Sequence, residues 1–87
     1  MQAITVELRI FMTFRRYLPA GASDGRAQVT LAGGATFEDL LKRIGLPVRE
    51  PKLFMINGRT HREESPANRQ VLADGDVIAI FPPIGGG

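Results

Sequence analysis

The chain has 87 residues, 44% of them hydrophobic, with 11 basic and 9 acidic side chains and no cysteine. This length supports one compact domain, because an independent core usually needs about 50 residues or more. The lack of cysteine excludes a disulfide framework, a zinc-thiolate site and a cysteine nucleophile, and one histidine, His61, does not make a metal cluster. We therefore expect no bound metal or cofactor and no side-chain catalysis.

The charge and the apolar stretches also bear on location and partners. The arginines are dispersed and interleaved with carboxylates, which indicates a solvated surface and argues against nucleic-acid binding. No stretch approaches the roughly 20 apolar residues of a membrane span. The first residues, Met1 to Ile4, lack the basic and apolar regions of a secretory signal. We therefore expect a soluble, cytoplasmic protein with no membrane partner.

The N-terminal part alternates with a period of two, which predicts a half-buried strand. The residues on its inner face are Ile4, Val6, Leu8, Ile10 and Met12. Phe11 is an aromatic on the opposite face and is therefore a candidate partner contact. Turn-forming residues at 19–25 and a second alternating run at 27–31 predict another strand, which completes a hairpin.

The middle of the chain predicts one helix. Apolar residues at 37, 40, 41 and 44 keep the i, i+3, i+4, i+7 spacing of one helical face, with Thr36 as the N-cap and Gly45 at the C-terminal end. Residues 53–56 then predict a strand and Asn57-Gly58 a tight turn. The polar segment 59–70 is expected to be mostly loop, with a short further strand at 71–72, and Met55 and Met12 are interpreted as core residues.

The last predicted strand is Val77–Phe81, after a turn at 73–76 and before two prolines that end it. One helix across a mixed sheet of about four to five strands is an economical core for so short a chain, so we expect an α+β fold. The first and last strands are expected to lie parallel and adjacent at the centre. Phe81 would then face outward beside Phe11, and two neighbouring exposed aromatics indicate a partner surface.

The chain ends in Pro82-Pro83-Ile84-Gly85-Gly86-Gly87, without a charged side chain. We expect residues 1–81 to form the domain and residues 82–87 a flexible tail. Glycines can thread a narrow channel, and at about 3.3–3.6 Å per residue six residues reach roughly 20 Å. The terminal carboxylate is then the reactive group. It needs activation to an acyl-adenylate with ATP, after which a sulfur donor can displace AMP to leave a thiocarboxylate.

The closing residues, Asp74-Gly75-Asp76, Phe81-Pro82-Pro83-Ile84 and the Gly-Gly end, resemble those of the MoaD/ThiS-type sulfur carriers, and of MoaD in particular. The resemblance implies a β-grasp, ubiquitin-like fold. It also implies that Gly87, supported by Gly86, is adenylated by a MoeB-like enzyme with ATP and thiocarboxylated. The terminus would then be inserted into a MoaE-like large subunit of molybdopterin synthase, where it would donate sulfur to cyclic pyranopterin monophosphate and make the dithiolene of molybdopterin. The chain would not be an enzyme on its own. Its partner contacts would be Phe11, Phe81, Pro82, Pro83, Ile84 and Gly85.

Three alternatives stay open at this point. Gly85 gives a triple-glycine end that is closer to ThiS, the sulfur carrier for the thiamine thiazole. A ubiquitin-like modifier that forms isopeptide bonds with target lysines would use the same adenylation chemistry. A plain interaction module with an inert tail would use neither.

Overall fold

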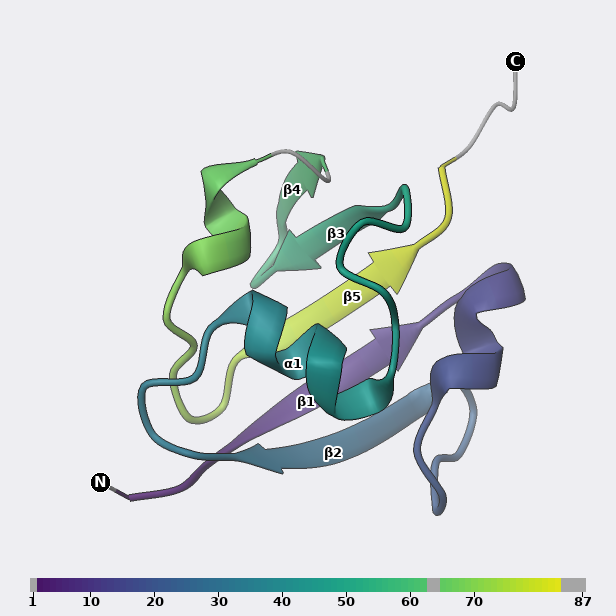
Figure 1. Ribbon diagram of the computed structural model, residues 1–87. Coiled ribbons are helices and arrows are strands. Elements are labelled where there is room, and N and C mark those ends of the chain that lie inside the picture. The colour runs from purple at the N-terminus through teal and green to yellow at the C-terminus, as the bar shows by residue number, and fades with distance from the viewer. Residues whose placement is uncertain (1, 63–64, 84–87) are drawn as a thin grey trace.

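The structure is a computed structural model, and it describes residues 2–62 and 65–83. Five strands form one mixed sheet in the order β2-β1-β5-β3-β4, with one α-helix packed across it (Figure 1). The elements in chain order are β1 (Ile4–Ile10), the 3-10 helix η1 (Met12–Tyr17), β2 (Arg26–Leu31), α1 (Phe37–Ile44), β3 (Leu53–Ile56), β4 (Arg59–Arg62), the 3-10 helix η2 (Pro66–Arg69) and β5 (Val77–Phe81). This is the expected α+β arrangement, with the strand and helix order of a β-grasp fold.

The first and last strands are parallel neighbours at the centre of the sheet, as the sequence predicted. Leu8 lies opposite Ile78 and Ile10 opposite Ile80, and all four side chains are at most 1% exposed. β2 pairs with β1 and β3 pairs with β5, both in antiparallel orientation. Two strands from opposite ends of the chain therefore form the most buried part of the sheet, which fixes the position at which β5 ends.

Helix α1 begins and ends as its sequence predicted. Thr36 Oγ1 accepts a hydrogen bond from the Asp39 N–H at 3.3 Å, and the Asp39 carboxylate accepts one from the Thr36 N–H at 2.9 Å, which completes a capping box. Gly45 ends the helix in the left-handed conformation with φ of 84°. The helix places Phe37 against Phe54 of β3, with ring centroids 4.0 Å apart, in the middle of the core.

The turn at Asn57-Gly58 joins β3 to β4 and also contacts the start of β5. Both residues have positive φ, 50° and 89°, as a two-residue hairpin turn requires. The Asn57 side chain donates to the Asp76 carboxylate at 2.8 Å and accepts from the Val77 N–H at 2.8 Å. These two bonds connect the turn to the last strand.

The expectation that residues 59–70 are mostly loop was wrong. Residues 59–62 form the edge strand β4, paired with β3, and residues 66–69 form η2. Residues 71–72 do not form a strand, although Val71 makes an isolated bridge with Thr36. His61, in this segment, is half-buried on β4, and its ring lies 5.2 Å from that of Phe54. A four-residue edge strand with one inward side chain has too little apolar pattern to be recognised by alternation.

The two methionines expected in the core lie elsewhere. β1 ends at Ile10, and Met12 begins η1 with a positive φ of 58° that directs its side chain outward, so it is 62% exposed. Phe14 of η1 is the buried residue instead, at 4%. Met55 is half-buried, because its neighbours Phe54 and Ile56 occupy the inner face of β3 and the pleat directs Met55 to the other face.

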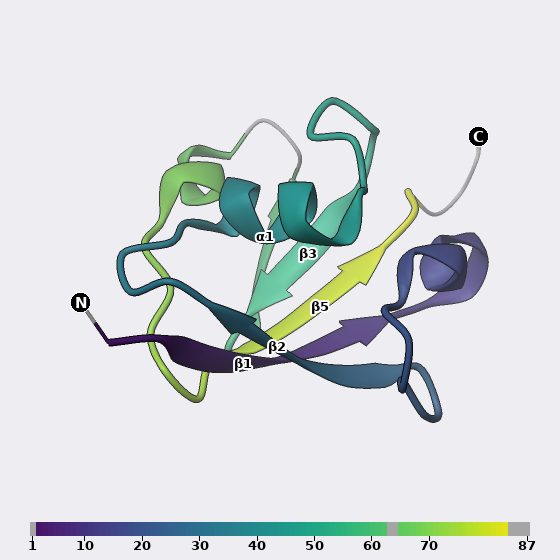
Figure 2. The same cartoon turned by 60° about the horizontal axis from the view of Figure 1, so that its bottom comes forward.

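The helices cover one face of the sheet. Figure 2 shows α1 and η2 above the sheet, and none of the described elements lies beneath it. The uncovered side is called the outer face below. In the part of the chain that the structure describes, no helix has the length and apolar character needed to cross a bilayer.

Candidate functional site

The site begins where β5 ends. Its alternation buries Ile78 and Ile80 and directs Val77, Ala79 and Phe81 to the outer face. Pro82 and Pro83 follow, half-buried and exposed. Neither proline has a backbone N–H to continue the sheet, so the chain leaves it after Phe81. The end of the sheet therefore fixes the base from which residues 84–87 continue.

Phe11 and Phe81 meet on the outer face at this base. Their ring centroids are 5.2 Å apart and the rings are nearly parallel, at 21°. The Phe11 N–H donates to the Ile80 carbonyl at 3.1 Å, which holds the end of β1 against the end of β5. Phe11 is nevertheless 41% exposed and Phe81 is half-buried. The structure thus places the two predicted contact residues together with their rings open to solvent.

The aromatic pair forms one end of an apolar strip on the outer face, at the point where β5 ends. Strand register places Leu53 beside Phe81 and Met55 beside Ala79. These side chains are half-buried although no described element covers them. An uncovered apolar area at the base of a tail is typical of a protein-binding surface. We call Phe11, Leu53, Met55, Val77, Ala79 and Phe81 the docking face.

Sequence reasoning found the two aromatics of the docking face and missed its other members. A signal was present, because Val77–Phe81 is apolar on both faces, which indicates that something covers each side. Leu53 and Met55 extend the same signal to β3. Met12 was wrongly expected in the core because the period of two was continued beyond Ile10, where β1 ends.

Basic side chains lie on one side of the docking face and on η1. Arg9 and Arg26 lie on the β1–β2 side of the outer face, and Arg9 pairs with Glu7. On η1 the Arg16 guanidinium donates to the Tyr17 hydroxyl at 3.2 Å and lies 5.0 Å from the ring centre. That hydrogen bond raises the pKa of Arg16 above its usual value.

The remaining predicted site residues, Ile84, Gly85, Gly86 and Gly87, lie outside the described residues. Within 2–62 and 65–83 the structure brings together no group of three or more His, Asp and Glu side chains that could hold a metal. The reactive group proposed from the sequence is the terminal carboxylate.

The fold and this surface define a ubiquitin-like β-grasp protein, and ubiquitin from Caldiarchaeum subterraneum shares the arrangement with a TM-score of 0.51 at 16% identity. The chain belongs to the ThiS family, whose model matches residues 10–87. This family of the MoaD/ThiS type comprises small ubiquitin-like carrier proteins.

Solved structures agree with this assignment. The HVO 2177 protein of Haloferax volcanii is 28% identical with a TM-score of 0.75, and the match covers 98% of this chain and 88% of that one. A putative molybdopterin converting factor, subunit 1, from Pyrococcus furiosus is 25% identical with a TM-score of 0.66, covering 93% and 99%. SAMP1 of Haloferax volcanii, at 24% identity and a TM-score of 0.69 over 95% and 99%, shares the fold. The comparison with curated proteins found no match.

Proposed function

We propose that this chain is a sulfur carrier for molybdopterin biosynthesis and acts as the small subunit of a molybdopterin synthase. The observation that carries the proposal is an exposed aromatic pair, Phe11 and Phe81, at the base of a tail that the ThiS family model matches to its last residue, Gly87. The similarity to the putative molybdopterin converting factor subunit of Pyrococcus furiosus supports the molybdopterin branch.

The proposed chemistry takes place on the Gly87 carboxylate. A MoeB-like enzyme binds ATP, the carboxylate oxygen attacks the α-phosphorus, and pyrophosphate leaves. Hydrosulfide, the sulfide-level sulfur source, then attacks the acyl carbon of the adenylate, AMP leaves, and a thiocarboxylate remains. The chain supplies no acid, base or metal to these steps, so it is not an enzyme alone. Its contribution is to present one carboxyl group to successive partners.

Each part of the chain has a role in this proposal. The docking face binds the partner, Pro82 and Pro83 end the sheet, and the tail predicted from the sequence serves as the carrier arm. Gly85 and Gly86 have no Cβ, so they can enter a channel too narrow for other residues. The tail then enters a MoaE-like large subunit, where the thiocarboxylate sulfur bonds to cyclic pyranopterin monophosphate and water cleaves the acyl–sulfur bond, which returns the Gly87 carboxylate.

Delivery of sulfur to the thiamine thiazole is the second candidate. The family match and Gly85, which completes a triple-glycine end, favour it. The two candidates share adenylation and thiocarboxylation and differ in the acceptor. They are therefore separated by the acceptor and not by the carrier chemistry.

Reconstitution with each acceptor tests the proposal. The thiocarboxylated chain is mixed with a MoaE-like subunit and cyclic pyranopterin monophosphate, and in parallel with a thiazole synthase and its substrates. We expect molybdopterin in the first mixture, and none when Gly86 and Gly87 are deleted. Thiazole in the second mixture alone would assign the chain to the other pathway. Stable higher-mass conjugates with target lysines, without either product, would identify a protein modifier.

A further inference from the structure

Two arginines lie directly opposite each other on the outer face. Arg9 of β1 and Arg26 of β2 are register partners in the antiparallel pair. Side chains opposite each other in such a pair have Cβ atoms about 4.5–5.5 Å apart, and like charges in this position destabilise a sheet. A surface position on an edge strand accepts many uncharged residues at no cost, so this pair needs an explanation other than stability.

Only one of these two charges is compensated within the described residues. Glu7 lies on the same face of β1, and its carboxylate accepts a hydrogen bond from Arg9 Nε. Arg26 is exposed, and no carboxylate in residues 2–62 and 65–83 lies within ion-pair distance of it. The pair therefore leaves one guanidinium open to an external anion.

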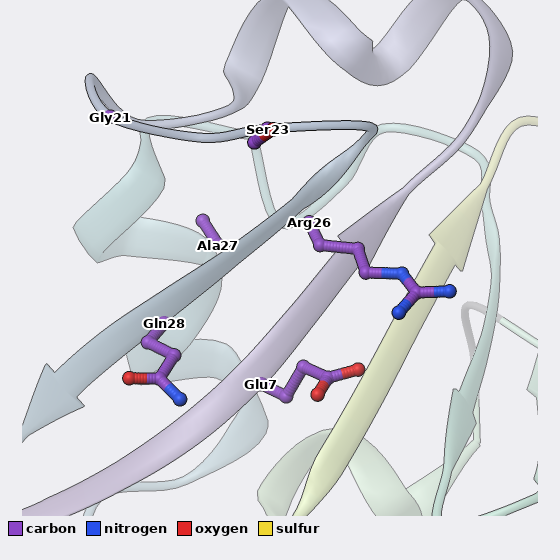
Figure 3. A pocket seen from close by; sticks show the side chains of 6 residues that line it. All are labelled: Glu7, Gly21, Ser23, Arg26, Ala27 and Gln28. Atoms are coloured by element: carbon purple, nitrogen blue, oxygen red, sulfur yellow. The ribbon is translucent and has the colours of Figure 1, made fainter.

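Arg26 borders a surface hollow. Its other lining residues include Glu7, Gln28 and Ser23, and Figure 3 shows Arg26 and Glu7 extending from β2 and β1 in the direction of β5. The hollow adjoins the docking face, because its lining residue Glu7 lies opposite Val77 in the parallel pair of β1 and β5. A partner that covers the docking face would therefore lie next to Arg26.

We propose that Arg26 receives a carboxylate side chain of the partner protein that covers the docking face. The carboxylate would complete an alternating row, Glu7, Arg9, Arg26 and the partner's acid, and would remove the repulsion between the two arginines. The partner surface would thus combine an apolar centre with an acidic side chain at the edge that faces β2. This inference rests on the proposed function, since it needs a partner on the outer face.

The stability of the free chain provides the first test. Arg26→Gln removes one of two opposed like charges, so its melting temperature is expected to equal or exceed that of the wild type. A lower melting temperature would mean that Arg26 is retained for the fold, which would overturn the proposal.

Association with a recombinant MoeB-like adenylating enzyme provides the second test. Arg26→Glu is expected to lower the association rate constant about tenfold at low ionic strength, because a charge at the edge of an interface acts mainly on encounter. At about 1 M salt the Debye length is near 3 Å, and the difference is expected to fall to within about twofold. Arg69→Glu, on η2 at the covered side of the sheet, makes the same charge change and is expected to bind as the wild type does.

The same mixtures, supplied with ATP and a sulfur donor, separate this inference from the proposed function. Wild-type chain that gains sulfur while Arg26→Glu and Arg69→Glu associate equally fast would refute the role of Arg26 alone. If Arg26→Glu associates more slowly as expected, but the wild-type chain gains no sulfur on Gly87, the proposed function alone is refuted. If Arg26→Glu raises the KM for ATP but leaves the rate of association with the enzyme unchanged, Arg26 contacts a nucleotide phosphate, and the proposal is overturned. Wild-type chain that fails to bind would contradict both.

Discussion

Truncating either ring of the aromatic pair separates its role in folding from its role in binding. Complete burial of a phenylalanine contributes about 1.5–3 kcal/mol, and Phe11 is 41% exposed, so Phe11→Ala is expected to cost about 1–2 kcal/mol of unfolding free energy. Phe81→Ala is expected to cost a similar amount. The rings are stacked at 5.2 Å, but in contact with water, so a double-mutant cycle should give a coupling near 0.5 kcal/mol, the lower end of the range for aromatic pairs. By contrast, Phe54→Ala in the core, where the side chain is 0% exposed, should cost about 3–5 kcal/mol.

The effect on binding is expected to be larger than the effect on folding. An aromatic anchor at the centre of an interface contributes about 2 kcal/mol or more, which corresponds to a roughly 30-fold weaker Kd. Two quantities are measured for each variant: its Kd for the adenylating enzyme, and the unfolding free energy of the free chain in urea. Val71→Ala is the matched control, because Val71 is also apolar and 60% exposed but lies outside the docking face. If both phenylalanine variants bind with wild-type affinity, the docking face does not bind the enzyme. A stability loss as large as that of Phe54→Ala would show that the rings are core residues.

Three further predictions concern the elements that support the site. Thr36→Ala removes the N-cap of α1 and is expected to lower the unfolding free energy by about 1 kcal/mol in urea, and an unchanged midpoint would show that the cap is dispensable. Hydrogen bonds from Thr36 lower the pKa of Asp39, so its carboxylate stabilises the fold above the unfolded-state pKa, and this contribution is lost as the pH falls through the lowered folded-state pKa. Asp39→Asn should therefore be less stable than wild type at neutral pH and approach it in strong acid, and a pH-independent difference would contradict this reasoning. Asn57→Ala removes two 2.8 Å hydrogen bonds, to Asp76 and Val77, and a residue suited to positive φ, so a loss of about 2–3 kcal/mol is expected in urea, and a loss below about 1 kcal/mol would contradict it.

The parts of the fold that could be predicted are those in which one face is buried. The period of two in β1 and the helical spacing of α1 follow from burial on a single side, and Thr36 and Gly45 mark the helix ends by their own chemistry. The central parallel pair followed from a single helix that covers one face of the sheet. These elements determine where β5 ends, so the position of Phe81 beside Phe11 was also predictable.

The parts that could not be predicted are determined by pairing and not by burial. β4 is stabilised by backbone hydrogen bonds to β3 and buries little, so its side chains carry almost no pattern. Asn57-Gly58 was a usable signal, because a two-residue hairpin turn requires a strand on each side of it. The strand pattern was continued to Met12 because a methionine side chain does not indicate that its residue has a positive φ. The Arg9–Arg26 pair depends on strand register, which neither side chain specifies.

The most direct test of the carrier function is the intact mass of the chain after incubation with ATP, a MoeB-like adenylating enzyme and a sulfur donor. We predict a mass gain equal to the replacement of one oxygen atom by sulfur, located on Gly87 by fragmentation and absent from a chain that lacks Gly86 and Gly87. An unchanged mass with an enzyme that binds the docking face, or sulfur at any other residue, would contradict it.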